Sequence, residues 1–185
     1  LAEYDGLEGI SWQWQSIDGA MVKAPLAQEA VGPNPTDRGK KWKQADVLVD
    51  ENGIPLALLV SGANRHDMKL LVPTLDAIVT PRPSPTTTGP QHLCADRGYS
   101  GQPAADAMKS RGYRPHVRQR GEEIAAKKRH SRNCPKRWVV ERTHSWINRF
   151  RKLLVRFEKT EASYLGLLEL ACALIIFRKV VSIYG

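Results

Sequence analysis

The chain has 185 residues, of which 42% are hydrophobic, and its net charge at neutral pH is +9. This is enough apolar material for one core, so a single domain over residues 1–185 is expected. The charge is uneven, because residues 111–159 carry +12 whereas the remaining residues together carry −3. Such a segment attracts phosphate, with a strong dependence on salt, although a solvated basic face is the plainer alternative.

Cysteine spacing and hydropathy exclude several classes of protein. The three cysteines, Cys94, Cys134 and Cys172, have neither the spacing of a zinc site nor that of a disulfide framework. The most apolar stretch, residues 164–177, is interrupted by Glu169 and falls short of the ~20 residues that span a bilayer. No signal peptide is visible. A cytoplasmic protein without a membrane partner is therefore expected.

Two segments open the chain. Alternation of side chains over residues 12–18 predicts a strand that ends at Asp18, with Asp18 on the same face as two tryptophans. Residues 32–44 follow as a loop with two prolines, two glycines and a basic cluster that includes Lys40 and Lys41.

A β-hairpin is the clearest local signal in the sequence. Residues 45–51 and 54–61 are apolar runs separated by Asn52-Gly53. This dipeptide favours the positive φ angles of a type I′ turn. Pro55 favours the start of a strand or a sheet edge, because proline donates no backbone hydrogen bond.

Helices and strands alternate in the rest of the chain. A loop over residues 80–90 holds four of the twelve prolines and is expected to be exposed and poorly ordered, and the basic residues 121–134 are expected to be mobile. The predicted elements are a helix over 67–79 N-capped by Asp67, a strand over 92–96, a helix over 103–110 N-capped by Ser100, a strand over 113–117, a helix from Pro135 to about 157 and a helix over about 162–183. This order indicates an α/β fold with a mixed sheet covered by helices.

Three acidic residues are candidates for metal-dependent chemistry on a polyanion. Asp18 and Asp96 each end a strand-like run, and Glu141 lies on a helix dense in Arg and Lys. Two divalent ions ~4 Å apart can activate a nucleophile and stabilise a leaving group in phosphodiester chemistry, and magnesium prefers such oxygen ligands. The plainer alternatives are turn aspartates and a surface ion pair between Glu141 and Arg137.

The predicted helix around Glu141 has two distinct faces. Glu141 shares one face with Arg137, His144 and Asn148, and this face is expected to point away from the core. His144 is read as a surface histidine rather than a phosphate ligand. Trp138 and Trp146 are read as core residues rather than as stacking partners for a flipped base. The opposite face, expected to pack on the sheet, consists of Val139, Thr143, Trp146, Phe150 and Leu153.

Together, five segments carry a family resemblance. They are residues 14–25, 48–56, 63–67, 95–100 and 137–146. In this order they resemble bacterial insertion-sequence transposases, and most of all the insertion-sequence-five group of DDE transposases. The likeness spans essentially the whole chain.

This resemblance implies a ribonuclease-H-like catalytic domain with Asp18, Asp96 and Glu141 as the DDE triad, binding two Mg²⁺ or Mn²⁺ ions. It implies cleavage of double-stranded DNA at transposon ends and strand transfer to target DNA, without a covalent enzyme intermediate. It also implies a homo-oligomer on DNA in the bacterial nucleoid, working with a product of an upstream reading frame. A DNA-recognition region ahead of Asp18 is expected to be absent.

The signature around the last acid is only partly matched. Related transposases carry tyrosine, arginine, glutamate and lysine there, and Arg137 and Glu141 match the middle two. Cys134 stands at the tyrosine position and Asn148 at the lysine position, which puts the DNA contacts of this signature in question. The DNA-contacting cations expected here are Arg137, Arg142, Arg149, Arg151, Lys152, Lys40, Lys41 and Arg97.

Two rival functions are compatible with the sequence. One is a non-catalytic remnant of a transposase that only binds DNA. The other is a host nuclease on the same scaffold, which would turn over substrates without terminal repeats and without strand transfer. The remnant would show neither specific metal binding nor cleavage of end-containing DNA.

Overall fold

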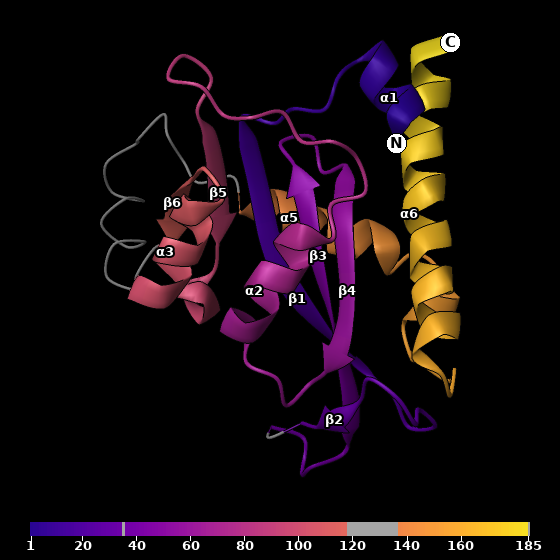
Figure 1. Ribbon diagram of the computed structural model, residues 1–185. Helices are drawn as coiled ribbons and strands as arrows, with labels where there is room; N and C mark the ends of the chain where they lie inside the picture. Colours follow the sequence, from indigo (N-terminus) through magenta and orange to yellow (C-terminus); the bar gives the residue numbers. More distant parts are fainter. Residues whose placement is uncertain (35, 118–136, 185) are drawn as a thin grey trace, which may run out of the picture.

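The structure, a computed structural model, describes residues 1–34, 36–117 and 137–184 (Figure 1). The predictions for residues 121–134, for Cys134 and for a helix beginning at Pro135 lie outside these residues. None of the described helices is long and apolar enough to cross a membrane.

A six-stranded mixed sheet forms the centre of the described structure. Its order is β2-β3-β1-β5-β6, with β4 paired to β3. Strands β1 and β3 and strands β3 and β4 are antiparallel, whereas β1, β5 and β6 run parallel. The strands are β1 (Trp14–Lys23), β2 (Gly32–Pro33), β3 (Lys41–Asp50), β4 (Pro55–Gly62), β5 (Gln91–Ala95) and β6 (Tyr113–Val117). An antiparallel part joined to parallel strands that alternate with helices confirms the predicted α/β class with a mixed sheet covered by helices.

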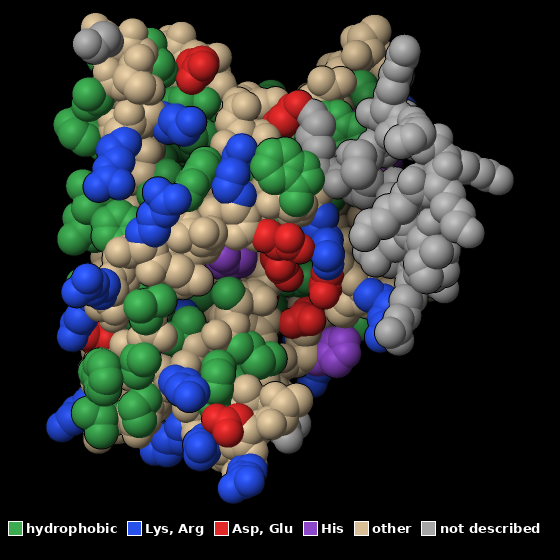
Figure 2. All heavy atoms as spheres, turned by 180° about the vertical axis from the view of Figure 1, so that it is seen from behind, with side chains coloured by type: hydrophobic (Ala, Val, Ile, Leu, Met, Phe, Trp, Pro, Cys, Tyr) green, Lys and Arg blue, Asp and Glu red, His purple; other side chains and the backbone are tan. Residues whose placement is uncertain are grey.

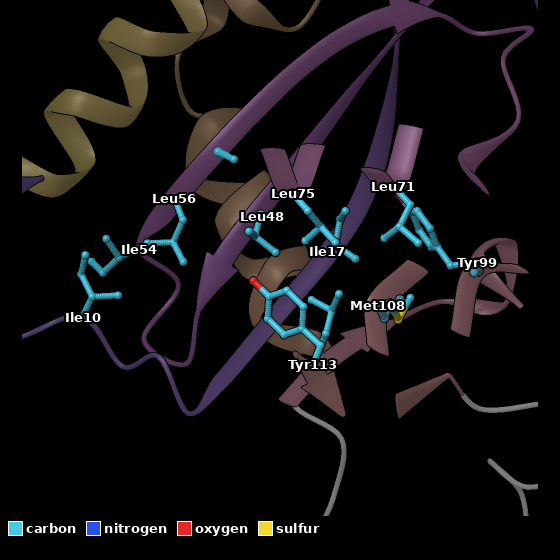
Figure 3. Close-up of a cluster of buried hydrophobic side chains, with 14 of the residues drawn as sticks. Ile10, Ile17, Leu48, Ile54, Leu56, Leu71, Leu75, Tyr99, Met108 and Tyr113 are labelled. Carbon is cyan, nitrogen blue, oxygen red and sulfur yellow. The ribbon is translucent and has the colours of Figure 1, made fainter. Parts of the chain in front are cut away.

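Helices cover both faces of this sheet (Figure 1). One core lies under α2 and α3, with Ile17, Leu48 and Leu71 near its centre (Figure 3). A second core lies between the other face of the sheet and α5 and α6. The helices are α1 (Ala2–Leu7), α2 (Asp67–Asp76), α3 (Gln102–Ser110), α5 (Trp138–Ile147) and α6 (Glu161–Tyr184), with 3₁₀ turns η1 (Arg97–Tyr99) and η2 (Arg151–Leu153).

The predicted hairpin is present. Strands β3 and β4 pair around Asn52-Gly53, and Gly53 has φ +83°. Pro55 is the first residue of β4, as expected. The alternation of β3 sends Ala45, Val47 and Val49 into the second core.

Several element boundaries differ from the predictions. The long helix ends at Ile147 and is followed by η2, and α1 and β2 were not predicted. Ser100 follows η1 as its C-cap, so Gly101 is the N-cap of α3. Asp67 is not the N-cap of α2, because the His66 side chain accepts the hydrogen bond from the Met68 backbone.

The 80–90 loop is irregular and largely exposed, as predicted. It is nevertheless attached to the sheet through Arg82. The Arg82 guanidinium lies 3.6 Å from the centre of the Tyr113 ring, and it donates to Gln91 and to the Arg111 carbonyl. Sequence composition gave no sign of this anchor.

Candidate active site

Strand pairing sets Asp18 beside Asp96. In the parallel pair of β1 and β5, Ile17 is opposite Ala95, so Asp18, the next residue of β1, lies beside Asp96, which follows the last residue of β5. Asp18 Oδ1 accepts the Gly19 amide at 2.9 Å, and Asp96 Oδ1 accepts the Gly98 amide at 2.7 Å. The predicted strand end at Asp18 is wrong, because β1 continues to Lys23 through its pairing with β3. The two carboxylates meet because β5 ends beside the middle of β1.

Glu141 reaches the same region from α5, which packs across β1 and β3. Glu141 is exposed and forms an ion pair with Arg137 at 3.1 Å. On the same helix, His144 Nε2 lies 3.3 Å from the backbone oxygen of Asp18, which fixes α5 against the strand carrying the first aspartate. On this face, acidic side chains gather beside Lys and Arg side chains (Figure 2).

Electrostatics link the three acids. The pKa of Asp18 is raised to about 6, first by burial and then by the charge of Asp96. Glu141 raises it further, while the Gly19 amide and Arg137 oppose the rise. Repulsion between carboxylates in a partly buried site is the condition that a bound divalent cation would relieve.

The acids fit a divalent cation by chemistry but do not enclose one. They are hard oxygen donors, the type that Mg²⁺ and Mn²⁺ take. Within residues 1–34, 36–117 and 137–184, however, no three His, Cys, Asp or Glu side chains are grouped closely enough to hold a metal ion. Glu141 is engaged by Arg137, so this side chain would have to turn for the three acids to share an ion.

His144 is not the surface histidine that was expected. Its ring is partly buried between α5 and β1, and burial lowers its pKa to about 4. Lys43 contributes to this lowering and is itself buried, with its pKa lowered to about 7 by burial. His144 therefore contacts the Asp18 backbone as a neutral ring at neutral pH.

Sequence reasoning missed a second group of acids behind the site. Burial raises the pKa of Asp46 on β3 to about 7, against hydrogen bonds from Gln44 and Tyr99. Asp67 accepts a hydrogen bond from Gln44 at 2.7 Å, which explains why it does not cap α2. The available signal was an aspartate at the second position of the apolar run 45–51.

Arg142, expected to contact DNA, is engaged within the protein. Its guanidinium lies 4.8 Å from the ring centres of both Trp138 and Trp146, and Nη2 donates to the Asn52 carbonyl at 2.7 Å. Trp138 is 55% exposed and is therefore not the core residue that was expected, whereas Trp146 is half-buried against the second core. Arg142 thus connects α5 to the β3–β4 turn.

The other expected DNA contacts occupy several surfaces. Lys152 on η2 pairs with Glu158 at 3.0 Å, and Lys40 pairs with Asp37 at 3.4 Å. Lys41 Nζ is 3.5 Å from the Ala27 carbonyl oxygen. The exposed residues Arg97, Arg149 and Arg151 lie on η1, just after α5 and on η2 respectively.

Two comparisons with known sequences identify relatives. The family described as "Transposase DDE domain" matches residues 15–176. The chain is also similar to the "Putative transposase for insertion sequence element IS402" of Burkholderia cepacia. The two are 39% identical over 147 residues, which are 78% of this chain and 67% of the relative.

Solved structures of Mos1 transposase are similar in arrangement. The pre-cleavage transpososome matches 97% of this chain with a TM-score of 0.49 and 12% identity. The strand transfer complex matches 78% of it with a TM-score of 0.38 and 11% identity. The chain covers 55% and 54% of these two solved chains, so it spans about half their length. At these TM-scores the likeness carries no functional weight.

Proposed function

Because the chain belongs to the transposase DDE domain family, we propose that residues 1–185 form a catalytic domain that cuts DNA at transposon ends and joins the ends to target DNA. One observation supports this proposal most directly. Asp18, in the middle of β1, lies beside Asp96, which follows the end of the neighbouring parallel strand β5, and the pKa of Asp18 responds to both Asp96 and Glu141. Three oxygen donors from three separate segments therefore share one electrostatic site beside Arg137.

Asp18, Asp96 and Glu141 are assigned the role of holding two divalent cations, Mg²⁺ or Mn²⁺. Bound in pairs, such ions activate the attacking oxygen and stabilise the leaving oxygen of a phosphodiester. Asp18 and Asp96 supply fixed oxygens, because Asp18 accepts the amide of the next strand residue, Gly19, and Asp96 accepts the Gly98 amide within η1. Glu141 is the mobile ligand of the three, since its side chain would leave Arg137 and turn toward the bound cations.

The remaining residues orient the substrate. When Glu141 leaves Arg137, the guanidinium becomes available to a DNA phosphate beside the cleavage site. Arg149, Arg151 and Lys152 offer further cations past the opposite end of α5 from Arg137. DNA binding, assembly of two or more copies on DNA and cooperation with an upstream-frame product are parts of the same proposal.

Neutralising any one of the three acids should abolish cleavage while leaving the fold intact. We expect Asp18→Asn, Asp96→Asn and Glu141→Gln each to lower metal-dependent strand cleavage by at least ~10³, equivalent to ~4 kcal/mol of transition-state stabilisation. DNA affinity should be largely kept. The measurement is single-turnover nicking of a labelled duplex containing the terminal repeats, with Mg²⁺ and with Mn²⁺.

Glu169→Gln, on the exposed surface of α6, is the matched control and should cleave like the wild type. Normal nicking by one of the three variants would remove that residue from the catalytic set. A wild-type protein that binds the DNA but never cleaves it would instead be a non-catalytic remnant. Cleavage of duplexes without terminal repeats, with no strand transfer, would indicate a general nuclease.

A further inference from the structure

Four polar side chains that the proposed chemistry does not use form a connected network beneath the turn that carries Asp96. Gln44 and Asp46 lie on β3, Asp67 opens α2 and Tyr99 ends η1. Gln44 Nε2 donates to Asp46 Oδ1 at 3.2 Å and to Asp67 Oδ1 at 2.7 Å. The Tyr99 hydroxyl donates to the same oxygen of Asp46 at 3.1 Å.

This network lowers the stability of the folded protein. Gln44, Asp46 and Tyr99 are each at most 1% exposed. Within the described part of the chain, Gln44 Oε1 and Asp46 Oδ2 are buried without a hydrogen-bond partner. A buried carboxyl group and unpaired oxygens oppose folding, and apolar side chains in these places would avoid that cost. We therefore look for a functional role of the network rather than a stabilising one.

The network reaches Asp96 through η1. Asp96 is the N-cap of this three-residue turn, and its Oδ1 accepts the Gly98 amide at 2.7 Å. Tyr99, the last residue of the turn, is held to β3 by Asp46. On the other side, a Cβ atom added to Gly98 would lie 2.2 Å from Asp67 Oδ2 and 2.9 Å from Asp96 Oδ1. The turn is thus fixed between β3 and the start of α2.

We propose that the Tyr99–Asp46–Gln44–Asp67 network positions Asp96, holding its carboxylate beside Asp18 so that the pair is preorganised for a divalent cation. The inference deepens the proposed function and rests on it. These four are positioning residues, because they act on Asp96 through η1. Groups that orient metal ligands typically change metal affinity by about 10-fold to 100-fold when removed.

Tyr99→Phe is the direct test, since it removes the hydroxyl and keeps the ring. The probe is Mn²⁺ alone, added to metal-free protein, with free Mn²⁺ measured by electron paramagnetic resonance. We expect Mn²⁺ affinity to fall by about 10-fold. In the cleavage assay, kcat should fall by a similar factor while DNA affinity is unchanged.

Tyr113→Phe is the matched control. Tyr113 is also buried in the first core, and its hydroxyl donates to Gln15 at 2.7 Å, away from η1. Both variants lose a buried hydrogen bond and should lose similar thermal stability. Only Tyr99→Phe should lose Mn²⁺ affinity, and equal losses in both variants would show a purely structural role.

Asp46 provides a second, graded test. Asp46→Asn keeps an oxygen acceptor for Tyr99 and should bind Mn²⁺ within about twofold of the wild type, whereas Asp46→Leu should bind about 10-fold more weakly. Equal weakening by both would mean that the charge of Asp46, not its position, matters. If Tyr99→Phe does not fold, Gly98→Ala replaces it, because its Cβ would displace Asp67 or Asp96.

The two levels of proposal fail differently. Wild-type Mn²⁺ binding that survives Asp18→Asn would overturn the triad, and with it the proposed function. Wild-type binding that is lost in Asp18→Asn but unchanged in Tyr99→Phe and Gly98→Ala would leave the proposed function standing and overturn the positioning network alone.

Discussion

Among single side chains, Asp18 shows most directly how the site opposes stability. Burial and the neighbouring acids raise its pKa to about 6. The folded protein therefore holds a proton more tightly than the unfolded chain, so stability falls as the pH rises from about 4 to about 6. Above that range Asp18 is ionised in the folded protein, and this lowers the free energy of unfolding by about 2 kcal/mol.

Asp18→Asn should remove this pH-dependent loss. In metal-free buffer at about pH 7.5, we expect the free energy of unfolding to exceed that of the wild type by about 2 kcal/mol, and at about pH 4 the two should nearly coincide. Urea unfolding at both pH values measures the difference. Asp106→Asn, on the exposed face of α3, is the control for removing one acidic side chain from the surface. A gain from Asp18→Asn that is equal at both pH values would contradict the electrostatic origin.

Among the secondary-structure elements, α5 depends on the β3–β4 turn for its place. Thr143 Oγ1 donates to the Gly53 carbonyl at 2.8 Å, next to the Arg142 contact with Asn52. Gly53 has φ +83°, and an added Cβ atom would lie 2.9 Å from Thr143 Oγ1. The hairpin turn is therefore also the docking point for the helix that carries Glu141.

Gly53→Ala should destabilise the protein by about 2 kcal/mol, from the strained φ angle together with the contact to Thr143. It should also lower cleavage, because α5 shifts. Gly166→Ala is the contrasting control: it lies inside α6 with nothing within 4 Å of its added Cβ, and we expect it to stabilise by about 0.5–1 kcal/mol. Chemical denaturation of both variants gives the comparison. A neutral Gly53→Ala would mean that the turn relaxes without moving the helix.

The sequence predicts elements best where the signal is local. Asn52-Gly53 encodes its own turn, and the apolar runs on either side of it form the largely buried strands β3 and β4. Prediction from the sequence fails where a residue far away in the chain determines which contact a side chain makes. Asp67 has the chemistry of an N-cap but is taken by Gln44, and the histidine before it caps α2 instead. Trp138 has core spacing but stays exposed beside Arg142.

For the whole molecule, the sequence predicts that the acids converge only if certain strands are neighbours in the sheet. Chain order indicated that Asp18 and Asp96 would meet if their strands were neighbours, and the register of β1 and β5 meets that condition. The network around Asp46 was not predictable, because its members come from β3, α2 and η1 and have no shared periodicity. The ion pair of Glu141 with Arg137 matches the plainer alternative for that residue, and it coexists with the electrostatic link to Asp18.

The uneven charge of the chain predicts which face of the protein binds DNA. Lys152 lies on η2, on the α5 side of the sheet, and its side chain is 62% exposed despite the pair with Glu158. Lys109 is an exposed cation on α3, which packs on the opposite face. If DNA lies along the α5 face, only Lys152 contributes to the release of counterions on binding.

Lys152→Ala should therefore weaken DNA binding to a similar degree for every sequence and reduce the slope of log affinity against log salt by about 1. Lys109→Ala should leave both unchanged. The measurement is a fluorescence-anisotropy titration of duplexes with and without terminal repeats at several salt concentrations. The Glu158 side chain is only 11% exposed and loses its partner in Lys152→Ala, so this variant should lose some stability, and a thermal melt checks that it is folded under the assay conditions. An unchanged slope for Lys152→Ala, or a reduced one for Lys109→Ala, would move the DNA path away from α5 and leave Glu141 without a nearby scissile phosphate.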